Sequence, residues 1–131
     1  MFEVTARAKV RDGELEGFKQ QAAEMMRATR ELDRETVRYD WFLSEDGTEC
    51  EVREAYANAD ALIEHSQHVA EARNKLFRDF ADGHTVALYA EPSPALAEAL
   101  KAMPPGAVKL KQFFLFQALD ANPEVVEEVP A

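Results

Sequence analysis

Apolar and polar residues alternate along the first strand-like segment and then change to a helical spacing. Over residues 2–10 every second residue is apolar, which predicts a strand with one apolar and one polar face. From residue 14 to about residue 32, apolar positions recur every three or four residues, as on one face of an amphipathic helix. The start of the chain therefore predicts a strand followed by a helix.

Residues 37–56 alternate with period two around Asp46-Gly47, which predicts a β-hairpin. Asp-Gly favours a two-residue type I′ turn, because both central residues of that turn need a positive φ. The residues that this turn would place opposite each other are Tyr39 and Glu54, Trp41 and Val52, Leu43 and Cys50, and, on the other face, Asp40 and Arg53 as an ion pair. One face of the hairpin is then aromatic and apolar, except for the carboxylate of Glu54.

A second helix is expected to begin at Asn58 or Asp60, to reach about Phe80 and to end before Asp82-Gly83. Residues 84–91 alternate again and predict a fourth strand. The order β-α-β-β-α-β is that of the ferredoxin-like α+β fold, an antiparallel sheet with both helices on one face. We therefore expect residues 1–91 to form such a domain, with the other sheet face uncovered.

Residues 92–119 are expected to extend this domain with a short helix, from residue 95 to about residue 103, and a last strand over residues 108–119. Residues 113–116 are apolar on both faces of that strand, which is typical of burial on both sides, as when a strand crosses onto a partner subunit. Residues 120–131 are acidic with two prolines, and we expect a loosely ordered tail.

The chain has 131 residues, the length of one domain, and a formal net charge of −10. An acidic protein is a poor partner for nucleic acid or an anionic membrane, and no apolar run approaches the ~20 residues of a membrane span. The N-terminus has no signal-peptide pattern, which favours a cytoplasmic protein. The single cysteine, Cys50, is expected to be a buried thiol. Neither a Gly-rich phosphate loop nor CxxC, HExxH or GxSxG is present, so we expect no metal or cofactor.

Two histidines, His65 and His68, lie three residues apart on the second predicted helix, and His65 borders its apolar stripe. A neutral imidazole there could take a proton from a phenol or hydroquinone. The alternative is a structural histidine that is hydrogen-bonded to a strand carbonyl or carboxylate. Two ligands at this spacing fall short of the three or four that zinc requires.

Glu54 is the other candidate for acid–base chemistry, because a carboxyl desolvated on an aromatic face has a raised pKa. The alternative is a structural pairing with Tyr39, Arg7 or His65. An apolar aromatic small molecule could bind against a wall formed by Phe18, Tyr39, Trp41, Tyr56 and His68.

The segment REAYANADALIEH resembles the signature of the antibiotic biosynthesis monooxygenase superfamily. That signature has an acidic residue at the end of a strand, an aromatic residue two positions later and a histidine after nine more, here Glu54, Tyr56 and His65. The resemblance covers about residues 1–91. It implies a homodimeric α+β barrel in which two sheets pack face to face. It also implies cofactor-independent oxygenation of quinols or polycyclic aromatic compounds.

The sequence departs from the family pattern in two places. Tyr56 stands where the family usually has a tryptophan, and the segment SQHVAEA after His65 differs from the longer pattern that carries a second histidine and a phenylalanine. One branch of the family degrades haem with an asparagine, a tryptophan and a histidine. This sequence has no asparagine in its first strand and no tryptophan at the signature position, which argues against haem.

Two hypotheses follow from these residues. In the first, the protein is a monooxygenase with His65 as the base and Glu54 as its orienting partner or as the base itself. In the second, it is a non-catalytic homodimer that binds a small apolar ligand or another protein. A cavity larger than ~300 Å³ would favour the first hypothesis. A closed core in which His65 and Glu54 are both fully paired would favour the second.

Overall fold

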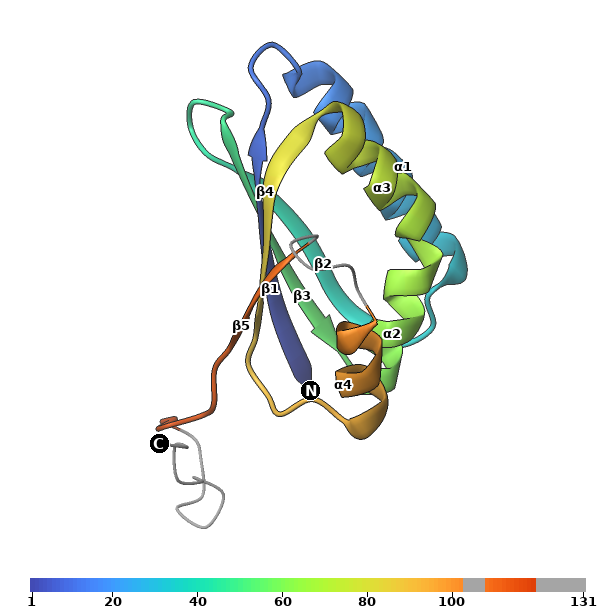
Figure 1. Ribbon diagram of the computed structural model, residues 1–131, viewed down its shortest axis with the longest axis vertical. Helices are drawn as coiled ribbons and strands as arrows, with labels where there is room; N and C mark the ends of the chain where they lie inside the picture. The colour runs from blue at the N-terminus through green and yellow to red at the C-terminus, as the bar shows by residue number, and fades with distance from the viewer. Residues whose placement is uncertain (103–107, 120–131) are drawn as a thin grey trace.

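The computed structural model describes residues 1–102 and 108–119, which form one five-stranded sheet with helices on one side (Figure 1). The elements are β1 (Phe2–Val10), α1 (Leu15–Leu32), β2 (Thr36–Leu43), β3 (Glu49–Tyr56), α2 (Ala59–His68), α3 (Ala70–Asp79), β4 (Ala81–Leu88), α4 (Pro94–Lys101) and β5 (Lys109–Gln112). The strand order is β2-β3-β1-β4-β5, antiparallel except for the parallel pair of β4 and β5. The predicted ferredoxin-like α+β fold is confirmed.

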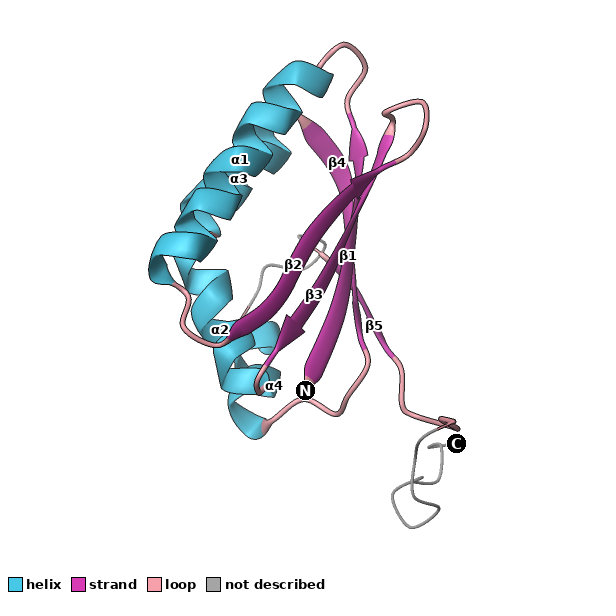
Figure 2. Ribbon diagram, turned by 180° about the vertical axis from the view of Figure 1, so that it is seen from behind, coloured by secondary structure: helices cyan, strands magenta, loops and turns pink. Residues whose placement is uncertain are grey.

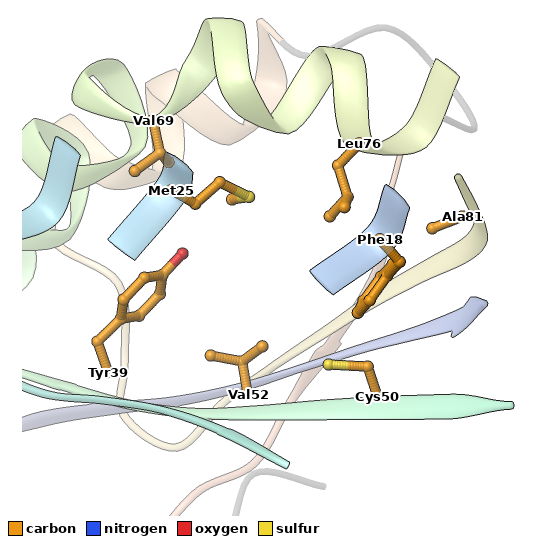
Figure 3. Packing of buried hydrophobic residues seen from close by; sticks show 8 residues of the cluster. All are labelled: Phe18, Met25, Tyr39, Cys50, Val52, Val69, Leu76 and Ala81. Carbon is orange, nitrogen blue, oxygen red and sulfur yellow. The ribbon is translucent and has the colours of Figure 1, made fainter. Parts of the chain in front are cut away.

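All the helices lie on the same side of the sheet, and no described element covers the opposite face (Figure 2). The core fills the space between the two layers. Figure 3 shows its larger cluster, in which α1 contributes Phe18 and Met25 and the sheet contributes Tyr39, Cys50 and Val52. These residues come from the alternating and helical apolar positions of the sequence, so the apolar pattern fixes which faces meet.

The hairpin has the predicted register but a different turn. Tyr39 faces Glu54, and the neighbouring predicted pairs are also present. Among the described residues, however, only glycines have a positive φ, so Asp46 cannot occupy a type I′ turn. Four residues, 45–48, form the loop, with Gly47 at φ +73°. The Asp46 side chain accepts hydrogen bonds from the backbone N–H of Thr48 and from the hydroxyls of Ser44 and Thr48, which stabilises this longer loop.

The predicted ion pair between Asp40 and Arg53 is wrong, although the two residues face each other across the hairpin. Asp40 instead lies 3.6 Å from Arg38 on its own strand, and Arg53 lies 3.1 Å from Glu51 on its own strand. A nearby partner on the same strand therefore replaces the cross-strand partner for each residue.

The segment predicted as one helix is divided at Val69 into α2 and α3. The side chain of Asn58 accepts a hydrogen bond from the backbone N–H of Ala61, so Asn58 is the N-cap that the sequence suggested. Val69 still donates its N–H to the carbonyl of His65 and accepts from Arg73, so the chain keeps helical hydrogen bonds through the junction. Side chains of α2 and α3 can therefore point into the same space.

The fourth strand starts earlier than predicted, and Asp82-Gly83 lies inside β4 rather than at the end of the helix. The helix itself ends at Asp79, close to the predicted residue, and the guanidinium of Arg11 donates to the carbonyls of Phe77 and Arg78 in its last turn. Gly83, at φ +67°, lies in β4 within the register shift between the pairs Arg7–Thr85 and Lys9–Asp82, and a glycine can adopt the left-handed conformation that such a bulge requires.

The C-terminal extension begins with α4, which packs near α2, and continues with β5 at the edge of the sheet (Figure 1). Ser93 accepts a hydrogen bond from the N–H of Leu96 and caps α4; the predicted end of this helix, residue 103, lies outside the described residues. The last strand ends at Gln112, so the prediction of a strand to residue 119 is wrong. Residues 113–116 are exposed within the chain instead of buried on both sides. The predicted acidic tail, residues 120–131, lies outside the described residues.

None of the helices in the described part of the chain is both long enough and apolar enough to cross a bilayer.

Candidate functional site

A cavity of about 350 Å³ lies between the helices and the sheet. Its wall is mainly apolar and includes the predicted residues Phe18, Tyr39, Trp41, Glu54 and His65. Figure 3 shows Tyr39 rising from the sheet, with its hydroxyl directed towards Met25 of α1 and Val69 at the junction of α2 and α3. The structure therefore brings most of the predicted site residues around one cavity, and its volume exceeds the ~300 Å³ of a small ligand site.

Glu54 lies on β3, where the alternation of the strand directs its side chain towards the helices together with Val52 and Tyr56. The residue is only 9% exposed. Its carboxyl accepts a hydrogen bond from the Tyr56 hydroxyl. Burial raises the pKa of Glu54 to about 7, against the smaller opposing effects of the Tyr56 hydrogen bond and the charge of Arg73. Glu54 can therefore exchange a proton near neutral pH.

Tyr56 is completely buried and does not belong to the cavity wall. Its ring centre lies 5.3 Å from that of His65, and its hydroxyl donates to Glu54. Burial, followed by the charge of Glu54, raises the pKa of Tyr56, so the phenol stays protonated. Tyr56 therefore holds Glu54 from behind rather than contacting a ligand.

Asp33, the residue that ends α1, binds both histidines of α2. Its carboxylate oxygens lie 2.7 Å from Nδ1 of His65 and 2.6 Å from Nδ1 of His68, and Thr36 donates its hydroxyl to the same carboxylate. Burial alone would raise the pKa of Asp33, but the hydrogen bonds from Thr36, His68 and His65 outweigh it and hold the pKa below its usual value. Asp33 is therefore an ionised acceptor.

Burial lowers the pKa of His65 below its ordinary value and outweighs the hydrogen bond and charge of Asp33. A neutral His65 must donate its Nδ1 proton to Asp33, so Nε2 is the nitrogen that can accept a proton. Its ring also contacts Tyr39 edge-on, with the ring centres 4.6 Å apart. Asp33 thus fixes the tautomer and Tyr39 restricts the tilt of the imidazole.

His68 was predicted among the ligand-binding residues, but it is not part of the cavity wall. Its Nδ1 contacts Asp33 and its Nε2 lies 3.8 Å from Glu64. Each of the two histidines therefore contacts a different oxygen of the Asp33 carboxylate, and of the two only His65 lines the cavity.

Phe18 and Trp41 form the aromatic side of the cavity. Trp41 packs edge-on against both Phe18 and Tyr39, with ring centres 6.1 and 5.7 Å apart. Its indole Nε1 is the one buried side-chain nitrogen or oxygen of the described residues that has no hydrogen-bond partner. This nitrogen is shielded from solvent within the aromatic side of the cavity.

Sequence reasoning missed Arg73 and His84, which also line the cavity. Arg73 donates from Nη1 to the hydroxyl of Ser66, at 3.0 Å, and to its carbonyl, at 3.3 Å. His84 stacks on Phe77, and burial, followed by the charge of Arg73, lowers the pKa of His84 to about 4. Arg73 follows His65 by eight residues, which is two successive i+4 steps. This helical spacing could have predicted that both side chains lie on the same face of the helical segment.

Cys50 is buried, as predicted, and borders the cavity. Burial, followed by the charge of Glu51, raises its pKa to about 11, so it is a protonated thiol at neutral pH. In the parts of the chain that the structure describes, no group of three or more His, Cys, Asp or Glu side chains converges as metal ligands would.

With this geometry in view, the sequence can be compared with known families. The antibiotic biosynthesis monooxygenase family matches residues 1–84. The chain belongs to this family, because the match covers well over half of its length. A search among curated proteins gives no match.

Several solved structures resemble this one. MupZ from Pseudomonas fluorescens has 24% identity and a TM-score of 0.71, with 96% of this chain and 98% of that chain covered. Rv0793 from Mycobacterium tuberculosis has 25% identity and a TM-score of 0.60, with 72% of this chain and 97% of that chain covered. SO0527 from Shewanella oneidensis has 17% identity and a TM-score of 0.61, with 69% and 89% covered. The comparison with MupZ therefore includes the C-terminal extension, whereas the other two cover a smaller part of this chain.

Proposed function

We propose that the protein is a cofactor-independent monooxygenase that oxidises a phenol, a quinol or another electron-rich aromatic molecule. The observation that carries this proposal is Glu54, a carboxyl with a pKa of about 7 in the wall of an apolar cavity. A base whose pKa is close to the working pH is suited to proton abstraction. Membership of the antibiotic biosynthesis monooxygenase family supports the reaction class.

Glu54 is the proposed general base, because its carboxyl lies in the cavity wall while Tyr56 holds it in place. His65 has the second role. Its Nε2 can accept a hydrogen bond from the substrate, because burial keeps the ring neutral and Asp33 orients it. Phe18 and Trp41 supply flat apolar surface for the ring of the substrate.

The proposed reaction of a quinol is balanced without a metal, flavin or external reductant. The base removes the hydroxyl proton, and the electron-rich ring reduces O₂ directly. One oxygen atom then replaces a ring hydrogen, and the other leaves as water. The products are a hydroxyquinone and one water molecule, so the substrate supplies all four electrons that O₂ accepts. The protein has to bind, deprotonate and exclude bulk water, which a mostly apolar cavity does.

Oxygen uptake by the purified protein tests this proposal, measured with a panel of quinols and polyphenols in the presence of a chelator. We expect uptake that rises with pH through about 7, because Glu54 must be ionised to act as a base. Glu54→Gln and His65→Ala should lower the rate. Glu51→Gln is the matched control, since Glu51 lies on the opposite face of the same strand and pairs with Arg7. Equal rates in the parent, Glu54→Gln and His65→Ala would refute the assignment.

The second candidate is a non-catalytic protein that binds a small apolar ligand in the same cavity. The observation that favours it is the pairing of Glu54 with Tyr56 and of His65 with Asp33, as expected for structural side chains. Ligand binding without oxygen uptake across the panel would support this second function.

A homodimer is part of both proposals. It is supported by the sheet face that the described helices leave uncovered and by the exposed apolar residues 113–116. Sedimentation at micromolar concentration tests it, and a monomeric mass would contradict the dimer.

A further inference from the structure

Arg73 places a positively charged guanidinium in the wall of the cavity. It lies on α3. Within the described part of the chain, its side chain donates hydrogen bonds to Ser66 and forms no ion pair. Arg7 also borders the cavity, but its guanidinium is 69% exposed and pairs with Glu51. Arg73 is half-buried, and an anionic partner favours a guanidinium that is partly removed from water, because desolvating an isolated charge is costly.

Titratable groups face Arg73 from every neighbouring layer: Tyr39 on β2, Glu54 on β3, His65 on α2 and His84 on β4. Burial keeps Tyr39 protonated and both histidines neutral at pH 7. Glu54, with a pKa of about 7, is the member of this group whose charge changes at neutral pH. When Glu54 is protonated, the group therefore carries a single positive charge without a counterion.

We propose that this cavity binds its substrate as a mono-anion, with the ionised phenol or enol oxygen on the guanidinium of Arg73 and the proton held by Glu54. This inference rests on the proposed function, because it assigns the form in which the aromatic substrate is bound. Arg73 is then a catalytic residue, since it touches the oxygen from which the proton leaves. Arg73 and Trp41 both line this cavity.

The proton balance favours a phenol or enol over a carboxylic acid. A neutral phenol enters while Arg73 and ionised Glu54 offset each other. The O–H bond breaks, Glu54 takes the proton, and the negative charge remains on the substrate oxygen beside Arg73. The total charge of the cavity is unchanged, which avoids the cost of a net charge in an apolar site. A carboxylic acid would arrive already ionised at pH 7, would require Glu54 to be protonated beforehand, and would leave no base for the reaction.

The test uses 4-nitrophenol, which is yellow when ionised and colourless when neutral. Its nitro group withdraws electrons from the ring, so it is a probe of binding rather than a substrate for O₂. The full-length protein is titrated with this dye over a range of pH, and absorbance reports both the affinity and the ionisation of the bound dye. The variants are Arg73→Met, which keeps an apolar stem, and Arg73→Lys, which keeps the charge. Arg78→Met, which removes an exposed arginine from the same helix, is the control.

In the parent protein, the bound dye should ionise at a lower pH than the free dye, because an adjacent positive charge favours the anion. Arg73→Met should weaken binding of the anion about tenfold or more, as expected for the loss of a charged hydrogen bond. Arg73→Lys should retain much of the binding, and Arg78→Met should match the parent. Circular dichroism verifies that each variant is folded.

Three results would overturn the inference. The bound dye could ionise at the same pH as the free dye or at a higher one, Arg73→Met could bind the anion as well as the parent does, or the parent could fail to bind the dye at millimolar concentration. No oxygen is consumed in this assay. Anion binding at Arg73 without oxygen uptake from quinols would therefore refute the monooxygenase alone, and oxygen uptake without anion binding would refute this inference alone.

Discussion

Ionisation of Glu54 should destabilise the fold, and Glu54→Gln should remove that effect. The pKa of the carboxyl is about 7 in the folded protein and 4.5 ordinarily. Between these values the folded state binds more protons than the unfolded state, so stability falls as pH rises through this range. At about 1.36 kcal/mol per pKa unit, the loss from pH 4 to pH 8 is about 3 kcal/mol. Glutamine keeps the shape and an oxygen that can accept from Tyr56, but it cannot ionise.

Urea denaturation of the parent and Glu54→Gln at several values between pH 4 and pH 8 measures this effect. The difference in free energy of unfolding should grow in favour of the variant by about 3 kcal/mol across that range. The contributions of other groups cancel in the difference. Glu51→Gln controls for removing a carboxylate from the same strand on its outer face. A difference between the parent and Glu54→Gln that does not change with pH would show that Glu54 is not desolvated as described.

Three further substitutions test other contacts. Asp33→Asn removes the charge and hydrogen bond that raise the pKa of His65, so NMR titration should show a lower pKa for His65; an unchanged or higher value would contradict the Asp33 contact. Gly17→Ala would place a methyl group into the ring of Phe80, and urea denaturation should show a loss of about 1–3 kcal/mol, whereas unchanged stability would contradict this packing. Gly83→Ala meets no close atom but must adopt φ +67°, which should cost about 1–2 kcal/mol in the same assay; a more stable variant would refute the bulge geometry.

Local patterns in the sequence were sufficient for the hairpin and for Glu54. The positions of Tyr39, Trp41 and Glu54 follow from alternation about Asp46-Gly47, and this register is the same for the two-residue turn that was predicted and the four-residue loop that is present. Strand register depends on the alternation of side chains between faces, which a sequence displays directly.

Contacts between distant segments could not be read in the same way. Asp33 reaches His65 and His68 from the end of α1, and nothing in the spacing of these residues indicates that they meet. The start of β4 was placed too late, because residues 81 and 82 pair with Val10 and Lys9 of β1, and local alternation does not reveal that pairing. For residues 113–116, the apolar pattern shows that burial would be favourable but does not identify what covers them.

The shape of the cavity and the position of its acid–base residues depend on different parts of the chain, because the C-terminal extension contributes only to the shape. It lies beyond the family match at residues 1–84, yet Leu96, Leu100 and Leu110 from it line the cavity. Glu54 and His65 lie on the other side of that boundary, within the sheet and helices of the shared domain. Under the function proposed above, exchanges among the three leucines would reshape the cavity and leave the proposed proton-transfer groups in place, so ligand preference could diverge without a change in chemistry.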